Sequence, residues 1–220
     1  MKIYKEVSNI KLTSVIPEIF ADRKDLKSDV WNTELTFEQG KKYLIEADSG
    51  TGKSSLCSYI YGLRGDYRGK IELDGHDINK FSTNRWCDVR QTEISILFQD
   101  LRLFGELTAM ENIQIKHRLS KIHNKRVIIN WFEQLGIADK INTRIDHMSY
   151  GQQQRVALIR ALCQRFNFLI LDEPISHLDN RNSDIMRDII LSEVGRQGAT
   201  LIATSIGKHM NIDYDKCLSL

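Results

Sequence analysis

The sequence predicts an α/β fold with a mainly parallel sheet, an antiparallel β edge and an inserted helical lobe. Short apolar segments at residues 42–47, 166–171 and 200–204 alternate with segments whose apolar residues recur at helical spacing. Apolar strands that alternate with helices are typical of a parallel sheet with both faces covered. An Asp-Gly pair within residues 69–75 signals a hairpin, which gives the antiparallel edge.

The composition indicates a soluble cytosolic protein. Of the 220 residues, 41% are hydrophobic and 27% are charged, an ordinary globular profile. The formal net charge is only +2, whereas proteins that bind nucleic acid usually carry a strong excess of basic residues. We therefore expect no nucleic-acid partner. We find no apolar run of the roughly 18 residues that a membrane span needs, and residues 1–12 lack the apolar stretch of a secretion signal. The four cysteines are scattered, which favours free thiols over disulfides or a zinc site.

The N-terminal half contains three expected elements. Residues 42–47 (KYLIEA) predict a short strand that runs into a loop of small residues. Residues 54–63 carry apolar side chains at helical spacing and predict a helix. Residues 69–75 (GKIELDG) predict the hairpin.

The C-terminal half predicts helices and strands in alternation. Residues 111–136 are expected to be largely helical, and a second helix is expected at 152–163. The apolar strand 166–171 follows, then a helix near 183–194 and the strand 200–204. The first of these helical regions has one apolar face, made of Val127, Ile128, Trp131, Phe132 and Leu135.

Residues 47–54 (ADSGTGKS) match a phosphate-binding P-loop, apart from alanine at the first glycine position. Gly50 and Gly52 let the backbone curl so that successive N–H groups surround phosphates, and the following helix contributes its positive end. Lys53 reaches the β- and γ-phosphates, and the Ser54 hydroxyl ligates Mg²⁺. An accidental turn with a surface lysine is the alternative, but the strand before and the helix after favour nucleotide binding. The residues predicted to contact the nucleotide are Ser49, Gly50, Thr51, Gly52, Lys53, Ser54 and Ser55.

Two acids end the apolar segment 168–174 (FLILDEP). A parallel strand presents Asp172 at its carboxyl end beside the P-loop, where such sheets bind ligands. Asp172 there suits Mg²⁺, held through a water. Glu173 suits the role of a general base that polarises the attacking water. The alternative is a strand that ends in solvated acids, which loses weight once a P-loop lies upstream.

Residues 148–162 (MSYGQQQRVALIRAL), just before LILDEP, resemble the signature motif of ABC ATPases. Residues 98–100 (FQD) and 107–113 are similar to the Q-loop region of that family, and residues 176–179 (SHLD) to its D-loop. The hairpin at 69–78 also resembles the segment that follows the P-loop helix in the family.

The matches run in the family's order and cover most of residues 36–205, so the chain is identified as a member of the ABC ATPase family. Residues 98–113 look similar to ATP-binding subunits of small lipoprotein or peptide exporters and of cell-division-type exporters. The resemblance implies a single ABC ATPase domain over residues 1–220. Residues 1–100 and 165–220 then form the nucleotide-binding core with a β subdomain, and residues 101–164 form the helical lobe.

The resemblance also implies ATP and Mg²⁺ as ligands and a head-to-tail dimer, either a homodimer or a heterodimer. Each ATP would lie between the P-loop of one subunit and the signature residues Ser149, Gly151 and Gln152 of the other. Gln99 would contact Mg²⁺ or the attacking water, and Asp179 would work across the dimer interface.

Adenine is usually stacked on an aromatic residue upstream of the P-loop in this family. Phe20 is the nearest candidate, and Trp31 is expected in the core.

Three residues depart from the family pattern. Tyr150 stands where a glycine is usual, and we expect its ring to point away so that only the backbone matters. His177 replaces a usually small residue. Ser205 stands where a switch histidine normally follows Thr204, and its hydroxyl reaches less far and cannot carry a proton's charge. The sequence therefore predicts slow ATP hydrolysis with binding retained.

The resemblance implies an ATPase that powers a membrane transporter whose membrane-spanning subunits are separate chains. It would lie in the cytoplasm, peripheral on the inner face of the cell membrane. The alternative is a soluble ABC ATPase that acts as an ATP-driven dimerisation switch in assembly or signalling. The sequence does not encode the transported substrate or the direction of transport.

Overall fold

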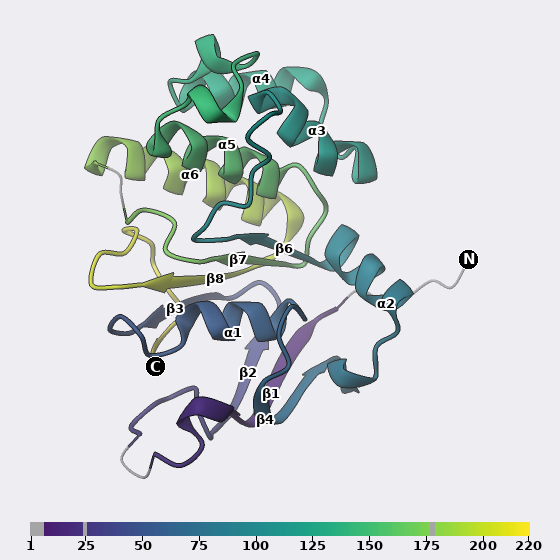
Figure 1. The fold of residues 1–220 in the computed structure, drawn as a ribbon, viewed down its shortest axis with the longest axis vertical. Helices are drawn as coiled ribbons and strands as arrows, with labels where there is room; N and C mark the ends of the chain where they lie inside the picture. Colours follow the sequence, from purple (N-terminus) through teal and green to yellow (C-terminus); the bar gives the residue numbers. More distant parts are fainter. Residues whose placement is uncertain (1–6, 24–25, 177–178) are drawn as a thin grey trace.

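A computed structural model describes residues 7–23, 26–176 and 179–220. Its centre is a five-stranded sheet in which every neighbouring pair is parallel, confirming the predicted α/β class (Figure 1). The order across this sheet differs from the order along the chain, as crossover connections require. That order is β6 (Ile94–Leu97), β7 (Phe168–Leu171), β8 (Thr200–Ser205), β3 (Lys42–Glu46) and β9 (Lys216–Ser219).

The predicted antiparallel edge is a second, four-stranded sheet. Its hairpin turns at Asp74 and Gly75, where Leu73 pairs with His76. Its longest strand, β1, alternates between buried and more exposed side chains, so that one face packs on the core. The strands follow the order β2 (Glu34–Glu38), β1 (Asn9–Pro17), β4 (Tyr67–Leu73) and β5 (His76–Asp77).

Six α-helices lie in the described part of the chain. The sequence predicted one largely helical region at residues 111–136, and the structure corrects this to two helices. Lys121 ends the first in a left-handed conformation, and the Asn124 side chain starts the second by accepting a 3.0 Å hydrogen bond from the Val127 N–H. The helices are α1 (Lys53–Ile60), α2 (Thr83–Asp88), α3 (Ala109–Ser120), α4 (Lys125–Gln134), α5 (Tyr150–Leu162) and α6 (Asn180–Gln197).

The parallel sheet separates two hydrophobic cores. Leu169 and Leu171 of β7 pack into the core formed with α3, α4, α5 and α6. Phe168 and Ile170 of the same strand pack into the opposite core, with α1 and the antiparallel sheet (Figure 1). A strand that is apolar on both sides fits this sandwiched position. The helices α3, α4 and α5 gather at one end of the molecule.

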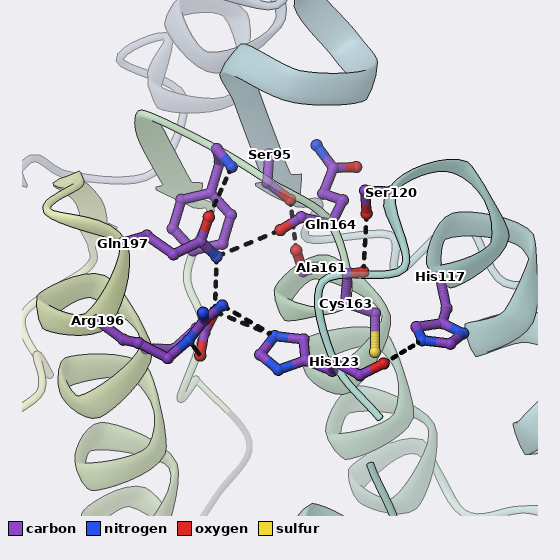
Figure 2. A network of polar contacts seen from close by, with 11 residues as sticks. Ser95, His117, Ser120, His123, Ala161, Cys163, Gln164, Arg196 and Gln197 are labelled. Atoms are coloured by element: carbon purple, nitrogen blue, oxygen red, sulfur yellow. Dashed lines mark hydrogen bonds and ion pairs between the residues drawn. The ribbon is translucent and has the colours of Figure 1, made fainter. Parts of the chain in front are cut away.

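A buried polar network ties these helices to α6. The His123 imidazole lies 3.1 Å from the Glu193 carboxylate, and both side chains are almost fully buried. Arg196 and Gln197 donate to the same carboxylate, each at 2.6 Å. Gln197 also donates to the Gln164 carbonyl, at the end of α5 (Figure 2). A charge shared among so many partners fixes the α3–α4 connection against α6.

Candidate nucleotide-binding site

Four strand ends of the parallel sheet converge on one edge. The P-loop follows β3, Gln99 follows β6 and the Asp172–Glu173 pair follows β7, while Ser205 is the last residue of β8. Because all four strands run in the same direction, their carboxyl ends lie together, where open parallel sheets bind ligands.

The phosphate loop is supported from behind by two aromatic rings. Gly52 has φ +101°, and a Cβ there would lie 3.1 Å from the Trp31 ring and 3.3 Å from the Phe20 ring. Only glycine fits both the backbone conformation and the space. The Trp31 indole N–H also donates to the Thr51 carbonyl at 3.1 Å. Trp31 therefore lies in the core, as expected. It also contacts the phosphate loop, and its position some 20 residues earlier in the sequence gave no sign of this contact.

Lys53 begins α1, and its side chain is almost fully buried. The ammonium group donates to the carbonyls of Ala47 at 2.9 Å and Asp48 at 2.7 Å. It also lies 3.9 Å from the Glu173 carboxylate. Burial lowers the pKa of Lys53, and the neighbouring acids oppose that shift. The lysine thus brings its charge to the centre of the loop, next to the second acid.

A chain of side-chain hydrogen bonds joins the loop to that acid. The Ser54 hydroxyl donates to Gln99 Oε1 at 3.3 Å, and Gln99 Nε2 donates to Glu173 Oε2 at 3.2 Å. Residues far apart in sequence thereby meet at one point. The structure brings together Ser54, Gln99 and Glu173. The sequence predicted them separately, from the P-loop, from the resemblance to the Q-loop region and from the acid pair after the apolar strand.

Thr204 organises the acid pair from the neighbouring strand. Its hydroxyl donates to Asp172 Oδ1 at 2.8 Å and accepts the Glu173 N–H at 3.1 Å. Glu173 has φ +51°, an uncommon conformation for a side chain of its size. The two contacts stabilise this turn.

The residues predicted to hold Mg²⁺ line one small cavity of about 190 Å³. Ser54, Gln99 and Asp172 offer a hydroxyl, an amide oxygen and a carboxylate there. Mg²⁺ prefers a few protein oxygens and keeps several waters or phosphate oxygens, so this donor set fits the ion. Clusters of three or more His, Cys, Asp or Glu residues that could hold a metal are absent from the described residues.

A second cavity of about 250 Å³ lies in front of the phosphate loop. Two exposed aliphatic side chains, Ile19 and Ile206, flank it. Phe20 also lines it, but the ring is only 3% exposed and the Arg23 guanidinium lies 4.4 Å from its centre. Stacking of adenine on Phe20 stays a prediction, and it requires Arg23 to move. The remaining lining residues include Ser49, Gly50, Gly52, Lys53, Ser54, Ser55, Gln99 and Glu173.

Ser205 is buried at the end of β8. Its hydroxyl donates to the Lys208 carbonyl at 2.7 Å, and its own carbonyl accepts the Ala47 N–H at 3.2 Å. The next residue, Ile206, is the one that lines the cavity before the P-loop. The predicted contact of Ser205 with a phosphate would require its hydroxyl to leave the Lys208 carbonyl.

The signature residues begin α5 and do not line that cavity. Gln152 accepts the Ser149 N–H at 3.0 Å, and the Gly151 carbonyl accepts from Arg155 at 2.9 Å. Tyr150 is 42% exposed and its hydroxyl donates to the backbone carbonyl of Gln99 at 2.9 Å. The expectation that the ring points away so that only the backbone matters stays a prediction, and the hydroxyl has this partner within its own chain. Nothing in the sequence indicates a bond between a side chain and a backbone so far apart.

Asp179 caps α6. It accepts the Asn182 N–H at 2.8 Å, and this hydrogen bond lowers the pKa of the Asp179 carboxyl. Residues 177 and 178, including His177, lie outside the described residues.

The fold and the site define a P-loop ATPase: a phosphate loop after β3, a lysine within it and an acid pair after β7, with β8 between the two strands. The family model described as ABC transporter matches residues 30–176. The chain belongs to the ABC transporter family and is an ABC-type ATPase.

Relatives and solved structures agree with that family. An uncharacterized ABC transporter ATP-binding protein, YbbA of Escherichia coli K12, is 30% identical over 85% of this chain and 83% of its own length. The uncharacterized protein Rv0986 of Mycobacterium tuberculosis H37Rv is also 30% identical, over 84% of this chain and 75% of its own. The dimeric structure of MJ0796, a bacterial ABC transporter cassette, superposes with a TM-score of 0.75 at 24% identity. It covers 89% of this chain and 87% of that one, and shows the shared fold.

Among the helices of the described residues, each is too short or too polar to cross a membrane.

Proposed function

We propose that this ATPase is the nucleotide-binding subunit of a transporter whose membrane-spanning subunits are separate chains. The observation that carries the ATP-hydrolysing role is the hydrogen-bonded chain from Ser54 through Gln99 to Glu173, with the Lys53 ammonium beside it. These contacts support the proposal, because they join the residues proposed as the phosphate-binding group, the metal ligand and the base.

Each residue then has a defined task. Lys53 neutralises the β- and γ-phosphates, and the loop residues 49–55 hold them through backbone N–H groups. Ser54, Gln99 and Asp172 would hold Mg²⁺, which supplies charge neutralisation on the phosphates when bound. Glu173 accepts a proton from the attacking water, and the Gln99 amide orients that water.

Signature residues complete the site from a second subunit. Ser149, Gly151 and Gln152 lie at the N-terminus of α5, where helix N–H groups and the helix dipole favour a phosphate. They lie apart from the cavity lined by the P-loop of their own chain. A head-to-tail dimer, homomeric or heteromeric, would bring them to the partner's ATP, with Asp179 at the interface.

Slow turnover is part of this proposal. The buried Ser205 hydroxyl is bonded to the Lys208 carbonyl, and aliphatic Ile206 faces the P-loop cavity instead. A donor that stabilises developing phosphoryl charge is worth roughly 10²–10³ in rate. Without such a group from this strand end, we expect firm ATP binding and low kcat.

The transporter role rests on the family and on its named members. The macrolide export ATP-binding/permease protein MacB of Psychrobacter arcticus is 31% identical over 76% of this chain, which covers 26% of that protein. The name of MacB covers both an ATP-binding part and a permease part. For the present chain, we propose that separate chains supply the permease. The subunit would then lie in the cytoplasm, on the inner face of the membrane.

Affinity purification of the full chain from membranes solubilised in detergent tests this role. We expect a multi-span membrane protein to co-purify in stoichiometric amounts. A stable complex made only of soluble proteins would instead support the dimerisation switch for assembly or signalling.

A further inference from the structure

The segment that carries Gln99 is held by α5 at two places. At the start of α5, the Tyr150 hydroxyl donates to the Gln99 carbonyl at 2.9 Å. Near its end, the Arg160 guanidinium donates to the carbonyls of Leu101 and Arg102, each at 2.6 Å. Leu101 and Arg102 both have positive φ, a conformation that needs such external support. The backbone after β6 is therefore held against α5.

The carbonyl that accepts from Tyr150 belongs to Gln99, the same residue whose side chain lies in the site. Its amide bridges the Ser54 hydroxyl and the Glu173 carboxylate, at 3.3 and 3.2 Å. Gln99 itself is exposed. A shift of the Gln99 carbonyl would move the amide relative to both partners.

The Tyr150 hydroxyl stays protonated and can therefore donate its hydrogen bond. Partial burial raises its pKa first, and the negative charges of Asp100 and Glu173 raise it further. The phenol therefore keeps its proton across the physiological range.

We propose that Tyr150 is a positioning residue for ATP hydrolysis, which sets the place of the Gln99 amide between Ser54 and Glu173 through the Gln99 carbonyl. The inference rests on the proposed roles of Gln99 and Glu173. Tyr150 thus does more than fill the position where the family pattern has glycine: it links the orientation of α5 to the geometry around the attacking water.

Tyr150→Phe tests this, because it removes the hydroxyl and keeps the ring. One neutral hydrogen bond corresponds to a factor of about 3–10, so we expect kcat to fall by that factor. KM for ATP should change less than about twofold, since the P-loop contacts are untouched. Tyr67→Phe is the matched control: it removes a hydroxyl of β4 that donates to the Asn79 side chain at 3.2 Å, and kcat should stay at the wild-type value.

The decisive step repeats Tyr150→Phe in a Gln99→Ala background, with purified full-length chain. The backbone carbonyl remains in that background but the amide is gone, so a positioning role predicts no further fall in kcat. An equal further fall would show that Tyr150 acts through stability alone and would overturn the inference. An unchanged kcat in single Tyr150→Phe, with a reduced kcat in Gln99→Ala, would also overturn it while leaving the proposed function intact. A wild-type kcat in Gln99→Ala would instead overturn the proposed role of Gln99, and this inference with it.

Discussion

The Thr204 hydroxyl donates to Asp172 Oδ1 at 2.8 Å, and both side chains are buried at adjacent strand ends. The Thr204 hydroxyl oxygen also accepts a hydrogen bond from the Glu173 N–H. One threonine thereby fixes a proposed metal ligand and the direction of the proposed base. Thr204 lies on β8, one residue before Ser205, so the end of β8 positions both acids that follow β7.

Thr204→Val should destabilise the fold and weaken the metal dependence of hydrolysis. The change leaves the buried Glu173 N–H without this acceptor, which costs about 1–3 kcal/mol. It also frees the Asp172 carboxylate to rotate. Urea unfolding and Mg²⁺ titration of ATPase activity measure the two effects. Thr200→Val, at the other end of the same strand, loses a 2.8 Å bond to the Glu38 carbonyl and serves as the control. It should lower stability alone, and an equal change in Mg²⁺ dependence there would contradict the account.

Lys53→Ala should weaken ATP binding by about 10- to 100-fold, because hydrogen bonds to charged groups are worth about 1.5–3 kcal/mol. Isothermal titration with ATP under Mg²⁺ measures the change. Lys70→Ala, an exposed lysine of β4 that pairs with Glu72, provides the control and should bind ATP as the wild type does. An unchanged affinity for ATP in Lys53→Ala would contradict the identification of residues 47–54 as a P-loop.

Ile206→His should raise kcat at nearly constant ATP affinity. Ile206 is 43% exposed and lines the cavity before the P-loop, so an imidazole there can reach a phosphate. We expect a gain of at least about 10-fold, below the roughly 10²–10³ of a fully preorganised donor. Ser205→His is the paired variant. Its ring would enter a buried position and displace the bond to Lys208, so we expect no gain. A gain in Ser205→His alone would show that Ser205, and not Ile206, faces the phosphate.

The Glu193 network should make stability depend on pH in the acid range. Burial alone would raise the pKa of Glu193, but hydrogen bonds from His123, Arg196 and Gln197 outweigh it and lower the pKa. A carboxyl with a lowered pKa stabilises the fold above its unfolded pKa, and that contribution is lost as pH falls through the folded value. The loss therefore begins below about pH 4.

Glu193→Gln should be less stable at pH 7, by about 1–3 kcal/mol, and should lose part of this acid dependence. Urea unfolding between pH 7 and pH 3 measures both, with Glu106→Gln at an exposed position as the control. Parallel pH profiles for wild type and Glu193→Gln would contradict the role given to the network.

Local sequence patterns account for much of the fold. The apolar runs of β3, β7 and β8 and the glycines of the P-loop each indicate their own structure, because burial on both faces and tight turns restrict the residue types allowed. The strands β1, β2, β6 and β9 were missed. β6 has only four residues, too few for a periodic signal, and it lacks the acid pair that marks the end of the equally short β7.

The remaining features depend on contacts between distant residues. The Tyr150–Gln99 bond joins residues 51 positions apart, and one partner is a backbone carbonyl that every residue carries. The burial of Ser205 likewise follows from the turn that brings Lys208 back over the strand end. Patterns of residue type predicted which groups belong to the site, whereas their directions follow from packing.

Glu173 is the proposed base for ATP hydrolysis, and Gln99 connects it to the P-loop residue Ser54. Glu173→Gln keeps the shape and the acceptor oxygen of the side chain but removes its basicity.

The most direct test is therefore a comparison of ATP binding, single-turnover hydrolysis and size-exclusion behaviour in wild type and Glu173→Gln, with Mg²⁺ present and with the membrane subunits included where they co-purify. We expect near-wild-type ATP affinity, hydrolysis reduced by at least about 10²-fold, within the range that a general base contributes, and an ATP-held dimer that accumulates. A variant that hydrolyses ATP at the wild-type rate and forms no such dimer would contradict the account.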